Sequence, residues 1–364
     1  MLDIRGLKTS KKLLPSEFSS HEATIVMLPY RKDIWRDDAK HAQEVIFSIV
    51  QIISKHERVY FCVDRKQTQV SLPSLNSNVV LCDVAYDDIW ARDISPLFLF
   101  VDDSLVGARF GFNAWGGKDE GSYWPWDNDA VFPTKFCDIL GINSFEVDLI
   151  LEGGALAYNG ANLIVTTESV LLNRNRNPNA TKAQIEQLFF ECFGIEKIIW
   201  IKRGFDFDET NGHIDVFLNF VDEYNIMLAW TEDSSNPQYP ILHEVEEQLK
   251  TATAVDGKPF EIHKTLMPMP MRITAEEAAG IIQHDSALTR AADLRLYPTY
   301  NNAYIFNGGV LVPTFNCPED EIAVKQFQNL FPDRIVYPLY SKEILIGGGN
   351  FHCILHEIPR RHQT

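Results

Sequence analysis

The sequence has a deficit of basic residues and lacks long hydrophobic runs. Its 33 lysines and arginines face 50 aspartates and glutamates, which gives a formal net charge of −17 at pH 7. A nucleic-acid-binding protein needs a basic face against phosphates, so this class is disfavoured. No stretch approaches 18 consecutive apolar residues, which disfavours a membrane span. The acidic balance instead favours a small cationic substrate.

The six cysteines form no CxxC pair and are widely spaced. Disulfide frameworks are typical of short secreted chains, and zinc sites need closely spaced ligands, so neither interpretation is favoured. Residues 1–18 include a few basic side chains but no apolar run that would suit a signal peptide. We therefore expect a reduced, cytoplasmic protein.

No Ser/Gly/Pro-rich or single-charge block interrupts the chain, so no linker is predicted. Apolar periodicity and two capping boxes predict helices at residues 38–56, after 181–184, after 274–277 and at 322–330. Strands are predicted to follow at residues 59–63, 198–201 and 335–337. Helices and strands therefore alternate along the whole length.

A weak internal repeat accompanies this alternation. Three segments begin with a polar residue, run as a strand, turn and return as a strand: residues 152–160, 213–225 and 301–309. The residues Asp93, Glu152 and His213 lead such units and lie 59 and 61 positions apart. Repeats of this size indicate blades around a central axis, with the leading residues converging at one end.

Reactive side chains occur beside turn glycines in four stretches, at residues 89–93, 152–154, 210–215 and 347–353. His213 can act as an acid or a base near neutral pH, and Glu152 can do so if it is partly desolvated. Asp93 and Asp215 remain as a pair of carboxylates, which matches the N–H groups of a planar guanidinium. A cysteine nucleophile would need an activating partner.

Each of these pieces also has a structural interpretation. A single cysteine is usually a small buried hydrophobe, and a single histidine usually has a structural role. A metal site is conceivable from four residues, namely His213, Asp215, His352 and Cys353. Their HxD and HC spacings are too generic to predict one.

Taken together, these stretches and others resemble the agmatine deiminases of the guanidine-modifying (pentein) superfamily. The resemblance runs from residue 15 to residue 354 and includes PSEF at 15–18, DIWARD at 88–93, FNAWGG at 112–117, LEGG at 151–154, LNRNRNP at 172–178, DETNGHID at 208–215 and GGGNFHC at 347–353. One departure is Ile94-Ser95-Pro96, where the family usually has Thr-Gly-Pro. So many ordered matches make the resemblance specific.

The resemblance implies a five-bladed β/α propeller formed by residues 1–364 as one catalytic domain. It implies Cys353 as the nucleophile, with His213 and Glu152 as acid/base groups. Asp93 and Asp215 would clamp the guanidinium. The other implied substrate-binding residues are Trp90, Trp115, Asp208, Glu209 and Asn350. The resemblance implies hydrolysis of agmatine to N-carbamoylputrescine, with no metal and no organic cofactor.

Three alternatives remain open from the sequence. A deiminase of free or peptidyl arginine would share the core but need a cation for the α-carboxylate, for which Arg109 is the candidate. A generic cysteine hydrolase would need an oxyanion hole rather than two guanidinium-binding acids. A catalytically inactive binding protein is disfavoured because all five reactive side chains are present.

The acidic segment before His213 favours agmatine, because an acid would attract a distal ammonium and repel a carboxylate. We expect Glu209, or failing that Asp208, to face this ammonium. Partners other than a small cationic guanidine are not predicted, neither nucleic acid nor membrane, although the chain could form a homo-oligomer.

Overall fold

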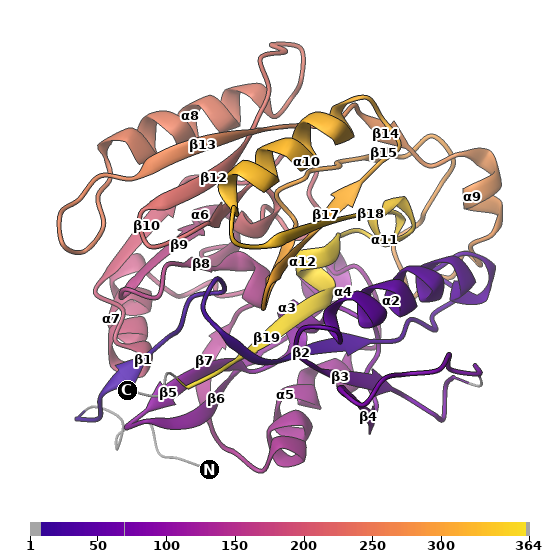
Figure 1. Cartoon of the computed structure of the whole chain (residues 1–364), viewed down its shortest axis with the longest axis horizontal. Coiled ribbons are helices and arrows are strands. Elements are labelled where there is room, and N and C mark those ends of the chain that lie inside the picture. Colours follow the sequence, from indigo (N-terminus) through magenta and orange to yellow (C-terminus); the bar gives the residue numbers. More distant parts are fainter. Residues whose placement is uncertain (1–8, 69, 362–364) are drawn as a thin grey trace.

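The computed structural model describes residues 9–68 and 70–361, which adopt an α/β fold (Figure 1). Part of the amino-terminal stretch considered for a signal peptide lies outside these residues. Two four-stranded sheets have the orders β1 (Lys12–Leu13), β5 (Leu97–Val101), β6 (Ser104–Gly111), β7 (Asn143–Ile150), and β19 (Leu355–Pro359), β2 (His21–Met27), β3 (Arg58–Val63), β4 (Val79–Asp83).

Smaller sheets complete the strand arrangement of the described residues. Three three-stranded sheets have the orders β10 (Lys197–Ile201), β9 (Leu163–Thr167), β8 (Ala157–Tyr158); β11 (Leu218–Phe220), β12 (Asn225–Trp230), β13 (Glu261–Leu266); and β16 (Tyr304–Phe306), β17 (Gly309–Thr314), β18 (Ile335–Tyr340). One two-stranded sheet pairs β14 (Met271–Arg272) with β15 (Arg295–Leu296).

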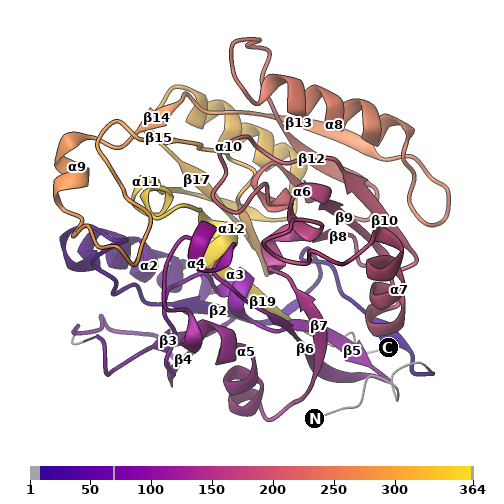
Figure 2. The ribbon, with the colours of Figure 1, turned by 180° about the vertical axis from the view of Figure 1, so that it is seen from behind.

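The helices divide into long ones and short turns. The long helices are α2 (Lys40–Ile53), α5 (Asp127–Leu140), α7 (Lys182–Phe193), α8 (Tyr239–Thr251) and α10 (Glu319–Leu330). The short helices and 3-10 turns are η1 (Asp37–Ala39), α3 (Ala91–Ile94), α4 (Gly117–Glu120), η2 (Gly153–Ala155), α6 (Glu168–Leu171), η3 (Ile214–Val216), α9 (Ala275–Ala279), α11 (Lys342–Ile346) and α12 (Phe351–Ile354). The long helices lie around the outside, whereas α3 and α12 lie near the middle (Figures 1 and 2).

The same local unit occurs in five sheets. In four of them, an antiparallel pair of consecutive strands is followed by a long helix and a third strand parallel to the second, as in β8–β9–α7–β10 and β11–β12–α8–β13. In the fifth, the antiparallel partner of β2 is β19, the last strand in chain order, and α2 and β3 follow β2. The predicted repeat of hairpin, helix and strand is therefore confirmed. Both predicted capping boxes are also confirmed, at Thr181 with Gln184 and at Thr274 with Glu277.

The start of the predicted hairpins was wrong. The structure places a 3-10 turn, not strand, directly after Glu152 and after His213, so β8 and β11 begin only at Ala157 and Leu218. A strand would send alternate side chains to opposite faces. The turns instead keep several consecutive residues at one end of the strands, where they meet the turns of neighbouring units.

Apolar side chains fill the space between each sheet and its helix. The largest cluster surrounds α2, β2 and β3 and includes Ile46, Ile49 and Phe61, none of which is exposed. Three further clusters occupy the other units. In the part of the chain that the structure describes, no helix is long and apolar enough to cross a membrane.

Candidate active site

Four short turns from different units meet at the centre of the molecule. Helix α3 contacts both α12 and η2, and η2 contacts η3. The side chains carried by or next to these turns are almost fully buried, and they are Asp93, Glu152, His213, Asp215 and Cys353. The structure thus brings together the five residues to which the sequence gave catalytic or clamping roles.

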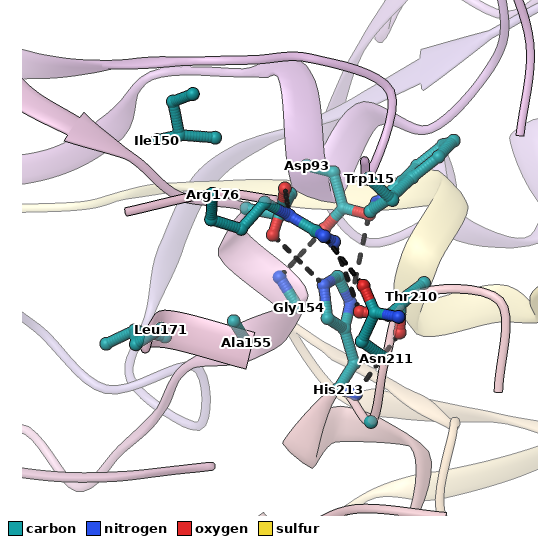
Figure 3. A network of polar contacts seen from close by, with 12 residues as sticks. Asp93, Trp115, Ile150, Gly154, Ala155, Leu171, Arg176, Thr210, Asn211 and His213 are labelled. Carbon is teal, nitrogen blue, oxygen red and sulfur yellow. Dashed lines mark hydrogen bonds and ion pairs between the residues drawn. The ribbon is translucent and has the colours of Figure 1, made fainter. Parts of the chain in front are cut away.

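His213 lies between two carboxylates. Its Nε2 is 3.4 Å from Glu152 Oε2. Its Nδ1 is 3.9 Å from Asp93 Oδ2 (Figure 3). Burial disfavours the charged imidazolium, but Asp93, Glu152 and Asp215 outweigh it and raise the pKa of His213 to about 9. His213 is therefore an imidazolium at neutral pH.

Glu152 is held as a carboxylate by an arginine behind the site. Arg176 Nε donates to Glu152 Oε1 at 2.7 Å, and neither side chain is exposed. Burial would raise the pKa of Glu152, but Arg176 and His213 outweigh this effect and lower it. Arg176 also donates to Asn211 Oδ1 and to the carbonyl of Thr210, which ties it to the segment before His213 (Figure 3).

Asp93 is oriented by two donors. The backbone N–H of Gly154 donates to Oδ1 at 2.8 Å, and the indole of Trp115 donates to Oδ2 at 2.9 Å (Figure 3). Burial raises the pKa of Asp93 to about 6. Only glycine fits at 154, because a Cβ would lie 2.6 Å from His213 Nδ1 and 3.0 Å from an oxygen of Asp93 and one of Asp215.

Cys353 faces acceptors rather than cations. Its Sγ lies 3.5 Å from Asp215 Oδ2 and 3.4 Å from Asn302 Oδ1. Burial, together with the charges of Asp215 and Asp93, raises the pKa of the thiol well above its ordinary range. Without a ligand the residue is therefore a thiol.

Asp215 is held from the opposite side by His352. The imidazole of His352 contacts Asp215 Oδ2 through Nδ1 at 2.8 Å and Glu17 Oε2 through Nε2 at 2.7 Å. Burial would raise the pKa of Asp215, but the hydrogen bond and charge of His352, together with the charges of His213 and Arg92, outweigh it and lower the pKa. Within the described residues, the buried Oδ1 of Asp215 has no hydrogen-bond partner, so it can accept from a ligand.

A cavity of about 560 Å³ leads to this centre. Its wall includes His213, Asn350 and Cys353 at the inner end. The outer wall is largely apolar and includes Phe207 and Tyr297, whose rings stack at 6.2 Å. A smaller adjoining recess is lined by Trp90, Asp93, Trp115, Glu209 and Cys353, among others.

Asn350 lines the large cavity, and Trp90 and Trp115 line the smaller recess, but all three side chains also bond within the protein. The indole of Trp90 donates to Asp88 at 2.7 Å, and its ring meets that of Trp115 edge to face. The side chain of Asn350 accepts from the N–H of Phe351 and so caps α12. Trp90 and Trp115 therefore act at least as walls, and Trp115 also fixes Asp93.

The two acidic residues proposed for the distal ammonium line the cavity, but their carboxylates are already bonded. Asp208 accepts from Thr210 and from the backbone N–H groups of Gly212 and His213. Glu209 forms a two-point ion pair with Arg290. The charge of Glu209 is therefore already balanced by Arg290.

Arg109, the sequence candidate for a substrate carboxylate, lies elsewhere. It belongs to β6 and donates to Thr134 at 2.6 Å, and it lines neither cavity. The arginines at the large cavity are Arg290 and Arg295. The sequence gave no role to Arg176, Arg290 or Asn302, since nothing local marks which acid or thiol each would meet.

The residues considered for a metal do not offer a free ligand set. Both ring nitrogens of His352 are used by Asp215 and Glu17. Among residues 9–68 and 70–361, no group of three or more His, Cys, Asp or Glu side chains is arranged to hold a metal ion.

Comparisons with known proteins identify relatives over nearly the full length of the chain. The profile of Porphyromonas-type peptidyl-arginine deiminases matches residues 13–359. The chain is 39% identical over 363 residues to a provisionally named agmatine deiminase of Latilactobacillus sakei, covering 98% of this chain and 99% of that protein. It is 36% identical over 349 residues to the agmatine deiminase of Ectopseudomonas mendocina, covering 95% of each.

A solved structure, the agmatine deiminase of Enterococcus faecalis, superposes with a TM-score of 0.92 at 32% identity and 96% coverage of both chains. The resemblance drawn from the sequence motifs is thus confirmed over nearly the full length. The chain belongs to the Porphyromonas-type peptidyl-arginine deiminase family, and its full-length relatives include agmatine deiminases.

Proposed function

We propose that this protein is an agmatine deiminase that hydrolyses agmatine to N-carbamoylputrescine and ammonia. The observation that carries the proposal is the free, buried Oδ1 of Asp215, which lies on the carboxylate next to the Cys353 thiol and across Gly154 from Asp93. Two buried carboxylates beside a nucleophile suit a planar cation that donates several hydrogen bonds. A guanidinium has this chemistry, and an amide or ester does not.

Binding of the substrate activates the Cys353 nucleophile. Without a ligand, Cys353 keeps its proton because Asp215 and Asp93 surround it with negative charge. A guanidinium bound by these carboxylates offsets their charge, so the thiol loses its proton to solvent water and becomes the thiolate. The thiolate then attacks the guanidinium carbon and forms a tetrahedral adduct.

His213 then serves in both half-reactions. As an imidazolium it gives its proton to the departing nitrogen, the C–N bond breaks and ammonia leaves. The neutral imidazole next takes a proton from water, and the resulting hydroxide attacks the S-alkylthiouronium carbon. Collapse of the second adduct breaks the C–S bond and releases the ureido product, and the proton of the adduct's hydroxyl group passes to the departing sulfur, which restores the thiol of Cys353.

Glu152 has a narrower role than a general acid. Because Arg176 keeps it ionised, we assign it the orientation of the guanidinium and of His213. Its charge contributes to the raised pKa of His213. Trp90, Trp115 and Asn350 would line the bound substrate.

Three finer features of the proposal are supported by the resemblance to the same family. We propose that the five repeated units are the blades of a five-bladed β/α propeller and that residues 1–364 form one catalytic domain. A cytoplasmic enzyme of putrescine formation is the biological role that this product suggests. The reaction uses protein side chains and water, so EDTA should leave the activity unchanged.

A deiminase of free or peptidyl arginine is the second candidate. It is supported by the family profile and by Arg295, which lines the large cavity. A panel of agmatine, arginine, a peptidyl arginine and methylguanidine, assayed for ammonia with mass detection of the product, separates the two. Preferred turnover of agmatine supports the proposal, and preferred turnover of an arginine substrate contradicts it.

A further inference from the structure

Arg290 is a buried cation at the cavity that the proposed mechanism does not use. Its side chain is 3% exposed. Its guanidinium donates through Nη1 and Nη2 to the two carboxylate oxygens of Glu209, and through Nη2 to the carbonyl of Gly347 at 2.8 Å. Although burial disfavours the charged form, Glu209 outweighs it and raises the pKa of Arg290.

These bonds join the two segments that carry the reacting groups. Glu209 lies four residues before His213, and Gly347 lies six residues before Cys353. The Arg290 guanidinium bridges one to the other. The segment before His213 and the loop before Cys353 are therefore linked by a contact outside the catalytic centre.

The arginine comes from an anchored segment. Backbone hydrogen bonds join Ile282 to Lys32, Trp124 to Ser286, and Leu288 to Ser122. These bonds hold the chain on the amino-terminal side of Arg290 against two other parts of the molecule. Arg290 is thus a buried side chain on a segment whose backbone is bonded to other parts of the molecule.

The glycine loop is shaped to accept this contact. Gly348 has a φ of +115°, and a Cβ at this position would lie 2.8 Å from Glu209 Oε2 and 3.0 Å from Arg290 Nη2. The next residue, Gly349, packs so closely that its Cβ would lie 3.2 Å from the Sγ of Cys353. Close packing therefore runs without a break from the ion pair to the thiol.

We infer that Arg290 is a positioning residue, which with Glu209 and Gly347 forms a clasp that sets His213 against Cys353. The inference rests on the proposed function for the roles of these two groups. It also gives Glu209 a different task from contact with the distal ammonium. Its charge is balanced by Arg290, and it acts on the reaction through the clasp.

Turnover of two substrates tests this inference. Butylguanidine has the same guanidinium as agmatine but no amine, so a clasp affects both substrates alike. Arg290→Met and Glu209→Gln should each lower kcat on both by the same factor, about tenfold to a hundredfold, with little change in KM, because each removes charge-assisted bonds that fix geometry. The kcat of the double variant should be no lower than that of the less active single variant, because both substitutions break the same ion pair.

Two further variants control for folding. Arg290→Lys keeps the charge but not the two-point geometry, so part of the activity should return. Arg36→Met removes a similar two-point pair with Glu343 that does not line the cavity, and it should leave both activities within about twofold. Thermal melting of all variants identifies any loss that is due to unfolding.

The competing outcomes are distinct. A loss of turnover with agmatine but not with butylguanidine would show that Glu209 binds the ammonium. Wild-type activity in all variants would show that the ion pair of Arg290 and Glu209 has no effect on the reaction. Either overturns the inference, as do additive losses in the double variant.

A measurement without substrate keeps this test independent of the proposed function. Iodoacetamide should alkylate Cys353 several-fold faster in Arg290→Met than in the parent or Arg36→Met, because release of the glycine loop exposes the thiol. An unchanged rate overturns the clasp whatever the turnover. The two failures can be told apart. If the wild-type enzyme releases no ammonia from the guanidine panel while Arg290→Met is still alkylated faster than the parent, only the proposed function is refuted.

Discussion

Cys353 lies among carboxylate and amide oxygens, which is an unusual environment for a nucleophilic thiol. Activated cysteines normally have a cation or a helix N-terminus nearby. Here Asp215 and Asn302 are the neighbours of Sγ, and the pKa of the thiol is raised. In the proposed mechanism, the cationic substrate supplies the missing positive charge and so favours the thiolate.

This dependence predicts a contrast between two alkylating reagents. Neutral iodoacetamide should react slowly with Cys353 at pH 7, because the thiol keeps its proton. A haloacetamidine, whose amidinium can bind Asp93 and Asp215, should react much faster, and saturating agmatine should slow it. Peptide mass mapping identifies the labelled residue. Equal rates for the two reagents would contradict substrate-assisted ionisation, and an active Cys353→Ala variant would contradict the nucleophile itself.

The two clamping carboxylates give a second prediction at this scale. Asp93→Asn and Asp215→Asn should each lower kcat/KM at least about tenfold to a hundredfold, because charge-assisted hydrogen bonds contribute roughly 1.5–3 kcal/mol. Asp256→Asn, a change at an exposed residue paired with Lys258, is the control and should have no effect. Steady-state assays with agmatine measure the difference. Full activity of either clamp variant would remove that residue from the site.

At the scale of elements, the short turns η2 and η3 decide where the catalytic side chains lie. Sequence periodicity predicted three of the five long helices, α2, α7 and α10, because amphipathic spacing is a local signal, but it did not predict α5 and α8. It missed the turns after Glu152 and His213, because a three-residue 3-10 segment leaves no periodic pattern. Their conformation depends on close packing with turns from other units.

Gly154 in η2 provides the test of that packing. Gly154→Ala should lower kcat by about a hundredfold, because the added Cβ would collide with His213 and displace the carboxylates. The control is Gly257→Ala, where φ is +87° and the structure describes no heavy atom within 4 Å of the new Cβ. It should cost about 1–2 kcal/mol of stability but no activity. Comparable activity of the two variants would show that η2 has room to adjust.

Across the whole molecule, buried imidazolium ions make stability depend on pH. The pKa values of His213 and His352 are both raised to about 9 by surrounding carboxylates, despite burial. An unfolded histidine titrates near 6.5. The folded chain therefore binds these protons more tightly, and the resulting stabilisation is complete below pH 6.5 and is lost as the pH rises through 9.

We therefore expect the free energy of unfolding to fall between pH 6.5 and pH 9, as measured by urea denaturation. His352→Gln should make this fall shallower. His356→Gln should not, because burial lowers the pKa of His356 to about 3 and the side chain is neutral throughout the range. A stability that is flat or rises over this interval would contradict the imidazolium assignment.

The sequence by itself determined the alternating elements, the acidic charge and the residue types suited to guanidine chemistry. These features are local or additive, so pattern and composition are enough to find them. Only the tertiary structure decided which charges pair. Arg176 meets Glu152 across 24 positions, Arg290 meets Glu209 across 81, and His352 meets Glu17 across 335. Such partners come together through the packing of separate units, and no spacing along the chain specifies them.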